Sequence, residues 1–228
     1  MVSFPNKKKE PSAKLVYRNL LPPLLRSDDT VVEVGALFGG TTLLLAQNVK
    51  QVHAFEANPP SFKWLQMYTK PYKNIKVYQE GVSDKTGHEF FNLTGHPFSV
   101  FASFTKNMSA PNPYTRTLIV KTRALDDFDV SASVLLLDCE GGEIKVLLGG
   151  KKFLSKARLV IVEIHETPTG STLGRVKEIL TDAGFDCSEK TLSLEETLRI
   201  VPKNDPDVTW KSELKNKTQT WIVAERVS

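Results

Sequence analysis

The chain has 228 residues, of which 40% are hydrophobic and 25% charged, and a formal net charge of +4. This composition is typical of a soluble globular protein, and the length suits a single domain over residues 1–228. No apolar run is long enough to span a membrane, no secretion signal is recognisable, and the mild positive charge leaves no nucleic-acid footprint. We therefore expect a cytoplasmic protein with neither a membrane nor a nucleic acid as partner.

Residues 1–30 are predicted to form an N-terminal helical extension. Within it, residues 12–26 carry a short amphipathic pattern that ends at Pro22 and Pro23, where a helix cannot continue. We expect this helix to pack across the edge of a sheet or across a ligand pocket.

A strand, a glycine turn and a helix are predicted over residues 31–46, VVEVGALFGGTTLLLA. The β-branched run at the start suits a buried parallel strand, and a helix-compatible apolar pattern follows the turn. Glycines let the backbone approach a ligand closely, and the start of a helix presents unpaired N–H groups. The stretch therefore predicts a site for a nucleotide-like cofactor.

The spacing of this turn favours S-adenosylmethionine among such cofactors. A dinucleotide fingerprint, G-x-G-x-x-G, would need a second glycine where this chain has Leu37, and no phosphate-binding loop follows. Glu33 precedes the turn, and Glu56 ends the next apolar run, at roughly the 20-residue distance at which an acid meets ribose hydroxyls. Two carboxylates without a phosphate site suit a cationic adenosine better than NAD or ATP.

Strands and helices alternate along the rest of the chain. This alternation predicts an α/β protein with a mostly parallel sheet, helices on both faces and a terminal antiparallel hairpin at one edge. After the first strand, the predicted strands are residues 51–59, 75–84, 133–143, 157–165, 185–192 and 220–225, and the predicted helices are 59–69, one running through Leu154, and 171–185.

One insertion, residues 88–123, breaks the alternation between the third and fourth strands. It contains segments that suit strands or loops on either side of SAPNPYT, and it has no helical period. Insertions at such a point usually cover a substrate site, so we expect residues 88–123 to cover the substrate here.

Polar residues follow five of the predicted strands. The carboxyl ends of parallel strands meet at one edge of a sheet, where ligands bind. These ends carry Glu33, Glu56, Ser83, Asp138 with Glu140, and Glu163 with His165. Their convergence predicts a single site, although an acid that merely caps a helix is the alternative for Glu140 or Glu143 taken singly.

Five motifs in order over residues 31–165 make the chain similar to the FkbM family of S-adenosylmethionine-dependent methyltransferases. They are EVGALFGG at 33–40, FEANP at 55–59, TRALDDF at 122–128, LLLDCEGGEIKVLLGG at 135–150 and LVIVEIH at 159–165; the D-x-E-G-x-E block is the most specific. The resemblance implies a Rossmann-like methyltransferase fold with a seven-stranded sheet. It also implies S-adenosylmethionine as methyl donor and O-methylation of a hydroxyl on a small molecule, a sugar or a glycan.

The resemblance further implies which residues contact the cofactor. Glu33 and the glycine turn would surround the methionine and sulfonium, Glu56 would accept both ribose hydroxyls, and Asp138 would lie beside the methyl group. The implied cofactor-binding residues are Glu33, Gly35, Ala36, Leu37, Gly39, Glu56, Ala57, Val82, Ser83 and Asp138, with Ala57 and Val82 flanking adenine and Ser83 or Asp84 at its edge.

Methyl transfer to a hydroxyl requires alignment of the acceptor oxygen and benefits from a base. The catalytic candidates are His165, whose ordinary pKa of about 6.5 suits proton removal, and the carboxylates Asp138 and Glu140, with Glu163 beside them. A histidine at a strand end can also be a hydrogen-bonded structural residue. Asp138 and Glu140 could instead hold a divalent cation that orients a diol, but the spacing shows no third ligand, so no metal ligands are predicted.

Departures from the family pattern keep two other hypotheses open. The family often has Asp in place of Glu33, Asn in place of Leu37 and Lys in place of Leu136. The two leucines leave open a non-catalytic module that binds S-adenosylmethionine. Tyr72 and Lys76 have the Tyr-x-x-x-Lys spacing of Rossmann-type NAD-dependent oxidoreductases, although they precede the third strand. The methyltransferase is the preferred hypothesis.

Overall fold

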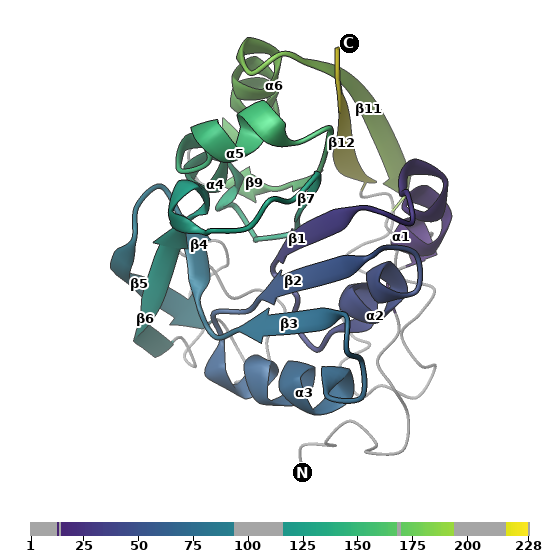
Figure 1. Cartoon of the computed structure of the whole chain (residues 1–228). Helices are drawn as coiled ribbons and strands as arrows, with labels where there is room; N and C mark the ends of the chain where they lie inside the picture. The colour runs from purple at the N-terminus through teal and green to yellow at the C-terminus, as the bar shows by residue number, and fades with distance from the viewer. Residues whose placement is uncertain (1–12, 14, 94–115, 168–169, 194–217, 228) are drawn as a thin grey trace.

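The computed structural model describes residues 13, 15–93, 116–167, 170–193 and 218–227. Its centre is a seven-stranded sheet with the strand order β11-β12-β8-β7-β1-β2-β3 (Figure 1). These strands are β1 (Thr30–Val34), β2 (Gln51–Phe55), β3 (Ile75–Tyr78), β7 (Val134–Leu137), β8 (Leu159–Ile164), β11 (Phe185–Ser193) and β12 (Thr218–Arg226).

Strand direction changes at one end of this sheet. Five neighbouring strands of this sheet, β8, β7, β1, β2 and β3, are parallel to one another, whereas β12 pairs antiparallel with both β8 and β11. The last strand of the chain therefore lies inside the sheet, and β11 is at its edge. This arrangement confirms the predicted seven-stranded, mostly parallel sheet with a terminal antiparallel pair.

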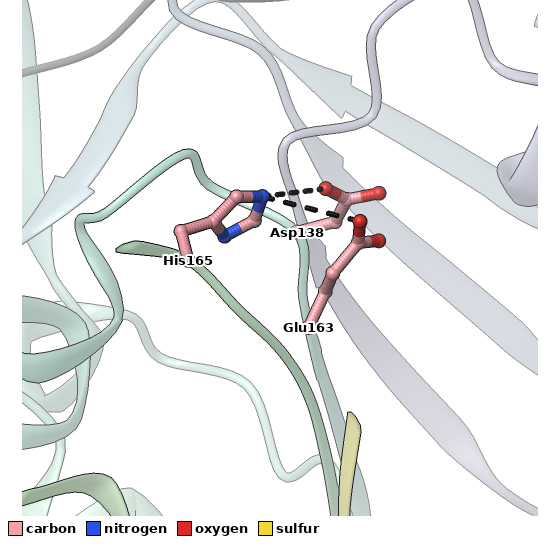
Figure 2. Close-up of side chains that lie close together, drawn as sticks. All are labelled: Asp138, Glu163 and His165. Carbon is pink, nitrogen blue, oxygen red and sulfur yellow. Dashed lines mark ion pairs between the residues drawn. The ribbon is translucent and has the colours of Figure 1, made fainter. Parts of the chain in front are cut away.

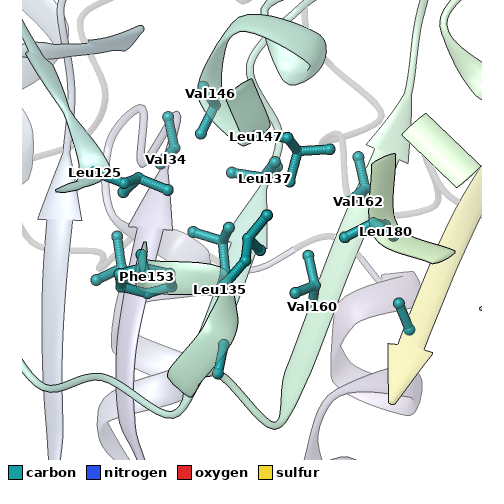
Figure 3. Close-up of a cluster of buried hydrophobic side chains, with 14 of the residues drawn as sticks. Val34, Leu125, Leu135, Leu137, Val146, Leu147, Phe153, Val160, Val162 and Leu180 are labelled. Atoms are coloured by element: carbon teal, nitrogen blue, oxygen red, sulfur yellow. The ribbon is translucent and has the colours of Figure 1, made fainter. Parts of the chain in front are cut away.

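Helices cover both faces of the sheet. Successive strand residues point to opposite faces, so Leu135 and Leu137 enter one core while Val134 and Leu136 enter the other. The first core, drawn in Figure 3, packs against α4 (Glu143–Leu148), α5 (Lys151–Lys156) and α6 (Leu173–Asp182). The second packs against α1 (Leu15–Leu20), α2 (Gly40–Ala46) and α3 (Pro59–Thr69).

The N-terminal helix predicted over residues 12–26 is present as α1, followed by the short 3-10 helix η1 (Pro22–Leu24). Tyr17 of α1 is 1% exposed and packs with its ring edge toward Trp221 of β12, at a centroid distance of 6.5 Å. The helix therefore belongs to the second core rather than to a loose extension. Among the described residues, no helix has the length and apolar character needed to cross a membrane.

A second sheet has three strands in the order β4-β6-β5 (Figure 1). Its strands are β4 (Gly81–Ser83), β5 (Gly87–Leu93) and β6 (Arg116–Ala124). The antiparallel pair of β5 and β6 is the described part of the predicted insertion 88–123. Residues 94–115 lie outside the described residues, so the covering of a substrate site by this insertion stays a prediction.

The prediction of one strand over residues 75–84 is wrong, because the chain leaves the main sheet after Tyr78 and joins the second sheet at Gly81. Glu80 lies between the two strands, is 9% exposed, and forms ion pairs of 2.7 Å with both Lys121 and Arg123 of β6. These pairs draw the segment toward β6. They join residues about forty positions apart, which the local hydrophobic pattern does not reveal.

The prediction of one helix through Leu154 is also wrong, because Gly149 and Gly150 separate α4 from α5. A Cβ on Gly149 would lie 2.2 Å from the carbonyl oxygen of Ser83, and one on Gly150 would lie 2.8 Å from Cδ1 of Leu125. The glycine pair lets the main chain pack closely against β4 and against the 3-10 helix η2 (Leu125–Asp127), and this close packing ends α4.

Gly35 occupies the point where the ends of β1 and β7 meet. Its φ is +89°, and a Cβ built there would lie 1.9 Å from the carbonyl oxygen of Asp138. A side chain would therefore be strained by its backbone conformation and would also collide with the neighbouring strand.

We expect Gly35→Ala to lower the free energy of unfolding by ~3 kcal/mol, measured by denaturant titration. The matched control is Gly174→Ala in α6, where a Cβ would meet nothing within 4 Å. The control should be neutral or slightly stabilising, because alanine favours a helix. Equal stability of the two variants would contradict the proposed collision.

Candidate active site

The loop between β1 and α2 is held by the end of β2. The N–H groups of Gly35 and Ala36 both donate to the carbonyl oxygen of Phe55 at 3.0 Å, and the N–H of Leu37 donates to Oε2 of Glu56 at 2.8 Å. Leu37 has a φ of +50°, which is uncommon for a residue other than glycine. Glu56 therefore stabilises the conformation of the loop that the sequence identified as the cofactor turn.

Two glycines of this loop, Gly35 and Gly39, pack against other residues of the protein. A Cβ on Gly39 would lie 2.9 Å from Cδ1 of Leu65 in α3, just as one on Gly35 would collide with Asp138. Both glycines have positive φ, of +92° and +89°. Close packing and backbone conformation thus explain these two glycines, in addition to the close approach of a ligand that the sequence suggested.

Glu33 and Glu56 are buried carboxylates on either side of this loop, 2% and 7% exposed. Glu33 accepts a hydrogen bond of 2.6 Å from Oγ1 of Thr42, and burial raises its pKa to about 8. Glu56 accepts N–H bonds from Leu37 and, at 2.7 Å, from Asn58, and burial raises its pKa to about 7. Burial therefore makes deprotonation of both carboxyl groups less favourable than in water.

The donors around these two carboxylates suit a cationic ligand with hydroxyl groups. Within the described part of the chain, neither Glu33 nor Glu56 has a lysine or arginine partner. A buried carboxylate is stabilised by an opposite charge or by further hydrogen-bond donors. The sulfonium, amino group and ribose hydroxyls of S-adenosylmethionine would supply both, so the residues present fit this cofactor.

A second group of acidic side chains lies at the ends of β7 and β8. Asp138 follows β7, and Glu163 is near the end of β8, 5% exposed. The hydroxyl of Tyr17 lies 2.7 Å from Oε2 of Glu163 and 3.1 Å from Oδ2 of Asp138. One phenol of α1 thus holds the carboxylates of two neighbouring strands close together.

His165 lies directly after β8 and faces these carboxylates (Figure 2). Its Nδ1 is 2.7 Å from Oε1 of Glu143, a fully buried carboxylate that also accepts the N–H of Gly141 at 2.9 Å. Nδ1 is therefore the donor in this pair. Nε2 lies 3.6 Å from Oε1 of Glu140, a residue with a φ of +52°.

The charge state of His165 differs from the sequence expectation. Burial disfavours the charged imidazolium, but the hydrogen bonds that it donates to Glu140 and Glu143, and the negative charges of these two residues, outweigh burial and hold the pKa of His165 well above its ordinary value. The acidic surroundings therefore favour the charged form of His165. The ordinary pKa, which suggested a ready base, does not apply in this acidic cluster.

The structure brings most of the predicted site residues together but not all of them. Ala57 packs beside the small core of the second sheet, and Val82 is 3% exposed within the main core. Ser83 is fully buried, and its hydroxyl lies within hydrogen-bond reach of two carboxylates, those of Asp84 and of Glu89 in β5. Their contact with adenine stays a prediction, as do the roles of the other site residues.

Three features of the site were not predicted from the sequence. Tyr17 is 121 and 146 residues from its two carboxylate partners, so no local pattern connects them. Glu143 was interpreted as an acid favoured by the start of a helix; it does begin α4, but it also orients His165. Thr42 lies nine residues after Glu33, a spacing across a strand, turn and helix that the amphipathic pattern does not flag.

The strand order and the acids at the strand ends define a class: this is the fold of the S-adenosylmethionine-dependent methyltransferases. A crystal structure of methyltransferase FkbM from Methylobacillus flagellatus is similar, with a TM-score of 0.59, 16% identity, and coverage of 93% of this chain and 48% of that one. This chain thus spans about half the length of that protein. At this identity the likeness shows the fold alone.

Curated relatives include three methyltransferases. The 2-O-methyltransferase NoeI of Sinorhizobium fredii is 22% identical over 70% of this chain and 72% of its own length. The hexuronic acid methyltransferase AglP of Haloferax volcanii is 26% identical over 76% and 70%. The ribosomal RNA small subunit methyltransferase A of Caldanaerobacter subterraneus is 30% identical over 59% and 50%.

Residues 33–187 match the methyltransferase FkbM domain. The chain belongs to the FkbM methyltransferase family, and it is an S-adenosylmethionine-dependent methyltransferase. The two other hypotheses, a non-catalytic module and an NAD-dependent oxidoreductase, are therefore set aside. In agreement, Lys76 of the Tyr-x-x-x-Lys spacing is exposed on β3 at the edge of the sheet.

We expect the stability of the ligand-free protein to fall as pH rises from about 4.5 to about 8. The pKa of Glu33 is raised from 4.5 to about 8 on folding, so the folded state binds this proton more tightly than the unfolded state does. Glu33→Gln should therefore be more stable than the wild type at pH 8, by on the order of 3 kcal/mol, and should show a smaller slope.

Denaturant unfolding across this pH range measures the effect. Glu189→Gln is the matched control, because Glu189 pairs with Lys177 on the surface, with both side chains 41% exposed. Slopes that are identical in Glu33→Gln and the wild type would contradict an uncompensated charge at Glu33.

We expect Glu56→Ala to weaken the binding of S-adenosylmethionine by ~2 kcal/mol, about 30-fold, because a charge-assisted pair of hydrogen bonds to the ribose is lost. Isothermal titration calorimetry with the cofactor and with S-adenosylhomocysteine gives the two dissociation constants. Glu189→Ala serves as the control and should bind like the wild type. An unchanged affinity in Glu56→Ala would exclude the ribose contact.

Proposed function

We propose that the protein transfers the methyl group of S-adenosylmethionine to a hydroxyl of a sugar, a glycan or another small molecule. The observation that carries this proposal is the cluster of Asp138, Glu140, Glu163 and His165, whose acceptor atoms lie 3.6 to 4.0 Å from Nε2 of the histidine. Such a group can bind a hydroxyl through its proton and then take that proton. A nucleophile that has no proton to lose on methylation would not need such a proton-accepting cluster.

The location of the cluster supports the same proposal. The carbonyl of Asp138 packs against Gly35 in the loop between β1 and α2. The acids at the ends of β7 and β8 therefore lie on one side of this loop, and Glu33 and Glu56 flank the same loop. An acceptor at the cluster would therefore lie next to the cofactor. One relative is named a 2-O-methyltransferase, which favours an oxygen as the acceptor atom, and another is named a hexuronic acid methyltransferase, which favours a sugar as the acceptor.

When bound, S-adenosylmethionine supplies a methyl group that its positive sulfur has already activated. The contribution of the chain is then to hold and align the reactants. In this proposal Glu56 binds the ribose, Glu33 lies near the methionine portion, and Asp138 orients the acceptor hydroxyl. The remaining acids receive the proton that the hydroxyl loses, the imidazole of His165 orients them, and the burial of the cluster limits the entry of water.

The acceptor class is tested by methylation assays with the full chain, S-adenosylmethionine and a panel of hexuronic acids and glycosides, with RNA as comparison. Nuclear magnetic resonance of the product identifies the methylated atom. We expect a methyl ether on a sugar hydroxyl, and no reaction of the same glycoside with that hydroxyl already blocked. A methyl group on a nucleobase nitrogen or a sugar carboxylate would contradict the proposal.

We expect His165→Ala to lower turnover about 100-fold while the dissociation constant for S-adenosylhomocysteine stays near the wild-type value, since the imidazole serves the acceptor side of the site. Kinetics and calorimetry on the same preparation separate the two quantities. Parallel losses of turnover, cofactor affinity and unfolding free energy would instead show that His165 acts through folding.

A further inference from the structure

Three donor atoms face a common point at the ends of β7 and β8 (Figure 2). They are Oδ1 of Asp138, Oε1 of Glu163 and Nε2 of His165, all within 4.8 Å of one another. Nε2 is 4.0 Å from Oδ1 and 3.9 Å from Oε1, which is too long for hydrogen bonds. Donors that bind one ion at about 2.2 Å lie roughly 3 to 4.4 Å apart, so the two separations from Nε2 suit shared coordination.

The backbone places these donors. The strands β7 and β8 are parallel neighbours in which Leu137 pairs with Val162, so the next residues, Asp138 and Glu163, come side by side. His165 follows two residues after Glu163 and so extends from the same face of the chain. The arrangement therefore depends on the register of the central sheet, which is rigid, and not on a loose surface loop.

Each of the three side chains forms a hydrogen bond that orients it, on the side away from the common point. The hydroxyl of Tyr17 contacts Oε2 of Glu163 and Oδ2 of Asp138, which turns the other carboxylate oxygens toward the histidine. Glu143 accepts the hydrogen of Nδ1 and so directs Nε2 of His165 toward them. Metal-binding histidines commonly donate their other N–H to a carboxylate in this way.

We propose that Asp138, Glu163 and His165 bind a divalent cation, and that the methyl acceptor is a compound with two adjacent oxygen atoms, such as a vicinal diol, that bind this cation together. The second part rests on the proposed function, while the first does not. Two carboxylates balance the charge of the ion. One imidazole among oxygen ligands favours Mn²⁺ over Mg²⁺, which prefers oxygen ligands throughout.

Access to the site is suitable for such an acceptor. The side chains of Glu163 and His165 are 7% and 9% exposed, whereas that of Asp138 is 18% exposed, so the cluster is most open beside Asp138. Three protein ligands leave positions free on an ion that takes six. A substrate with two adjacent oxygens can fill two of these positions and displace water from them.

The cation changes the part that His165 plays in the reaction. As a ligand, His165 releases the proton on Nε2 to solvent and cannot also be the base. Glu140, 3.6 Å from Nε2, is then the nearest carboxylate left to take the proton of the hydroxyl. The ion lowers the pKa of the hydroxyl that it binds. The hydroxyl proton passes to Glu140, and a carbon–oxygen bond forms as the methyl–sulfur bond breaks. S-adenosylhomocysteine then leaves as the second product.

Electron paramagnetic resonance of Mn²⁺ tests the site directly, because the sharp spectrum of the hydrated ion disappears on binding to protein. Titration of the chelator-treated full chain should show one site per chain. Glu163→Gln, which keeps an acceptor for Tyr17, and His165→Gln should each weaken binding at least tenfold. Glu189→Gln, on the surface in its ion pair with Lys177, should bind like the wild type.

Calorimetry with S-adenosylhomocysteine on the same samples verifies that each variant is folded. A variant that binds S-adenosylhomocysteine but not Mn²⁺ supports the cation site, and a wild type that leaves the spectrum of the hydrated ion unchanged overturns it. Binding of S-adenosylhomocysteine without Mn²⁺ would refute the cation site and leave the proposed function standing. Binding of Mn²⁺ without S-adenosylhomocysteine would refute the proposed function, and the diol acceptor with it, and leave the cation site standing.

The acceptor class is tested by comparing a glycoside that has a vicinal diol with its singly deoxygenated analogue, in the presence of Mn²⁺ and after its removal. We expect Mn²⁺ to raise turnover of the diol at least tenfold and to leave the analogue little changed. Equal stimulation of both compounds would overturn chelation of two oxygens by the ion.

Discussion

The contact between Gly35 and the carbonyl of Asp138 is the constraint on which the site depends. Val34 and Leu137 pair at the ends of two parallel strands, and the chains that leave them must pass within reach of each other. A side chain at position 35 would separate them, because its Cβ would lie 1.9 Å from the carbonyl oxygen. Because glycine has no Cβ, the cofactor loop can pack directly against the strand end that carries the acidic cluster.

The second property of this region is that several of its buried acidic side chains accept hydrogen bonds from neutral donors. Thr42 donates to Glu33, backbone N–H groups donate to Glu56, and the hydroxyl of Tyr17 donates to Glu163. Such donors orient the carboxylates and lower their pKa, but burial outweighs the donors and raises the pKa of both Glu33 and Glu56. A site of this kind favours cationic ligands, and both S-adenosylmethionine and the proposed divalent cation are cationic.

The sheet and the acids at its edge could be predicted because they follow from local patterns. Apolar runs indicate buried strands, and the residues at their ends must share an edge if the strands are parallel. The prediction of Glu33, Asp138 and His165 at one edge needed no knowledge of distant contacts. The FkbM resemblance added the identity of the ligand, which periodicity alone does not specify.

The remaining features depend on contacts between distant parts of the chain. Tyr17 reaches Asp138 and Glu163 from an N-terminal helix that looks like packing in the sequence. Glu80 redirects the third strand by pairing with Lys121 and Arg123, far along the chain. Hydrophobic patterns indicate which residues are buried, but not which polar groups form hydrogen bonds or ion pairs with each other. The site is built from such polar contacts between distant residues.

A crystal structure of the protein with S-adenosylhomocysteine would show whether the acidic cluster faces the methyl donor. We expect the ribose hydroxyls to bind Glu56 and the sulfur to face Asp138 and His165, so that a methyl group on it would point into the acidic cluster. A sulfur directed away from β7 and β8, or a ribose without contact to Glu56, would show that the cluster does not serve methyl transfer.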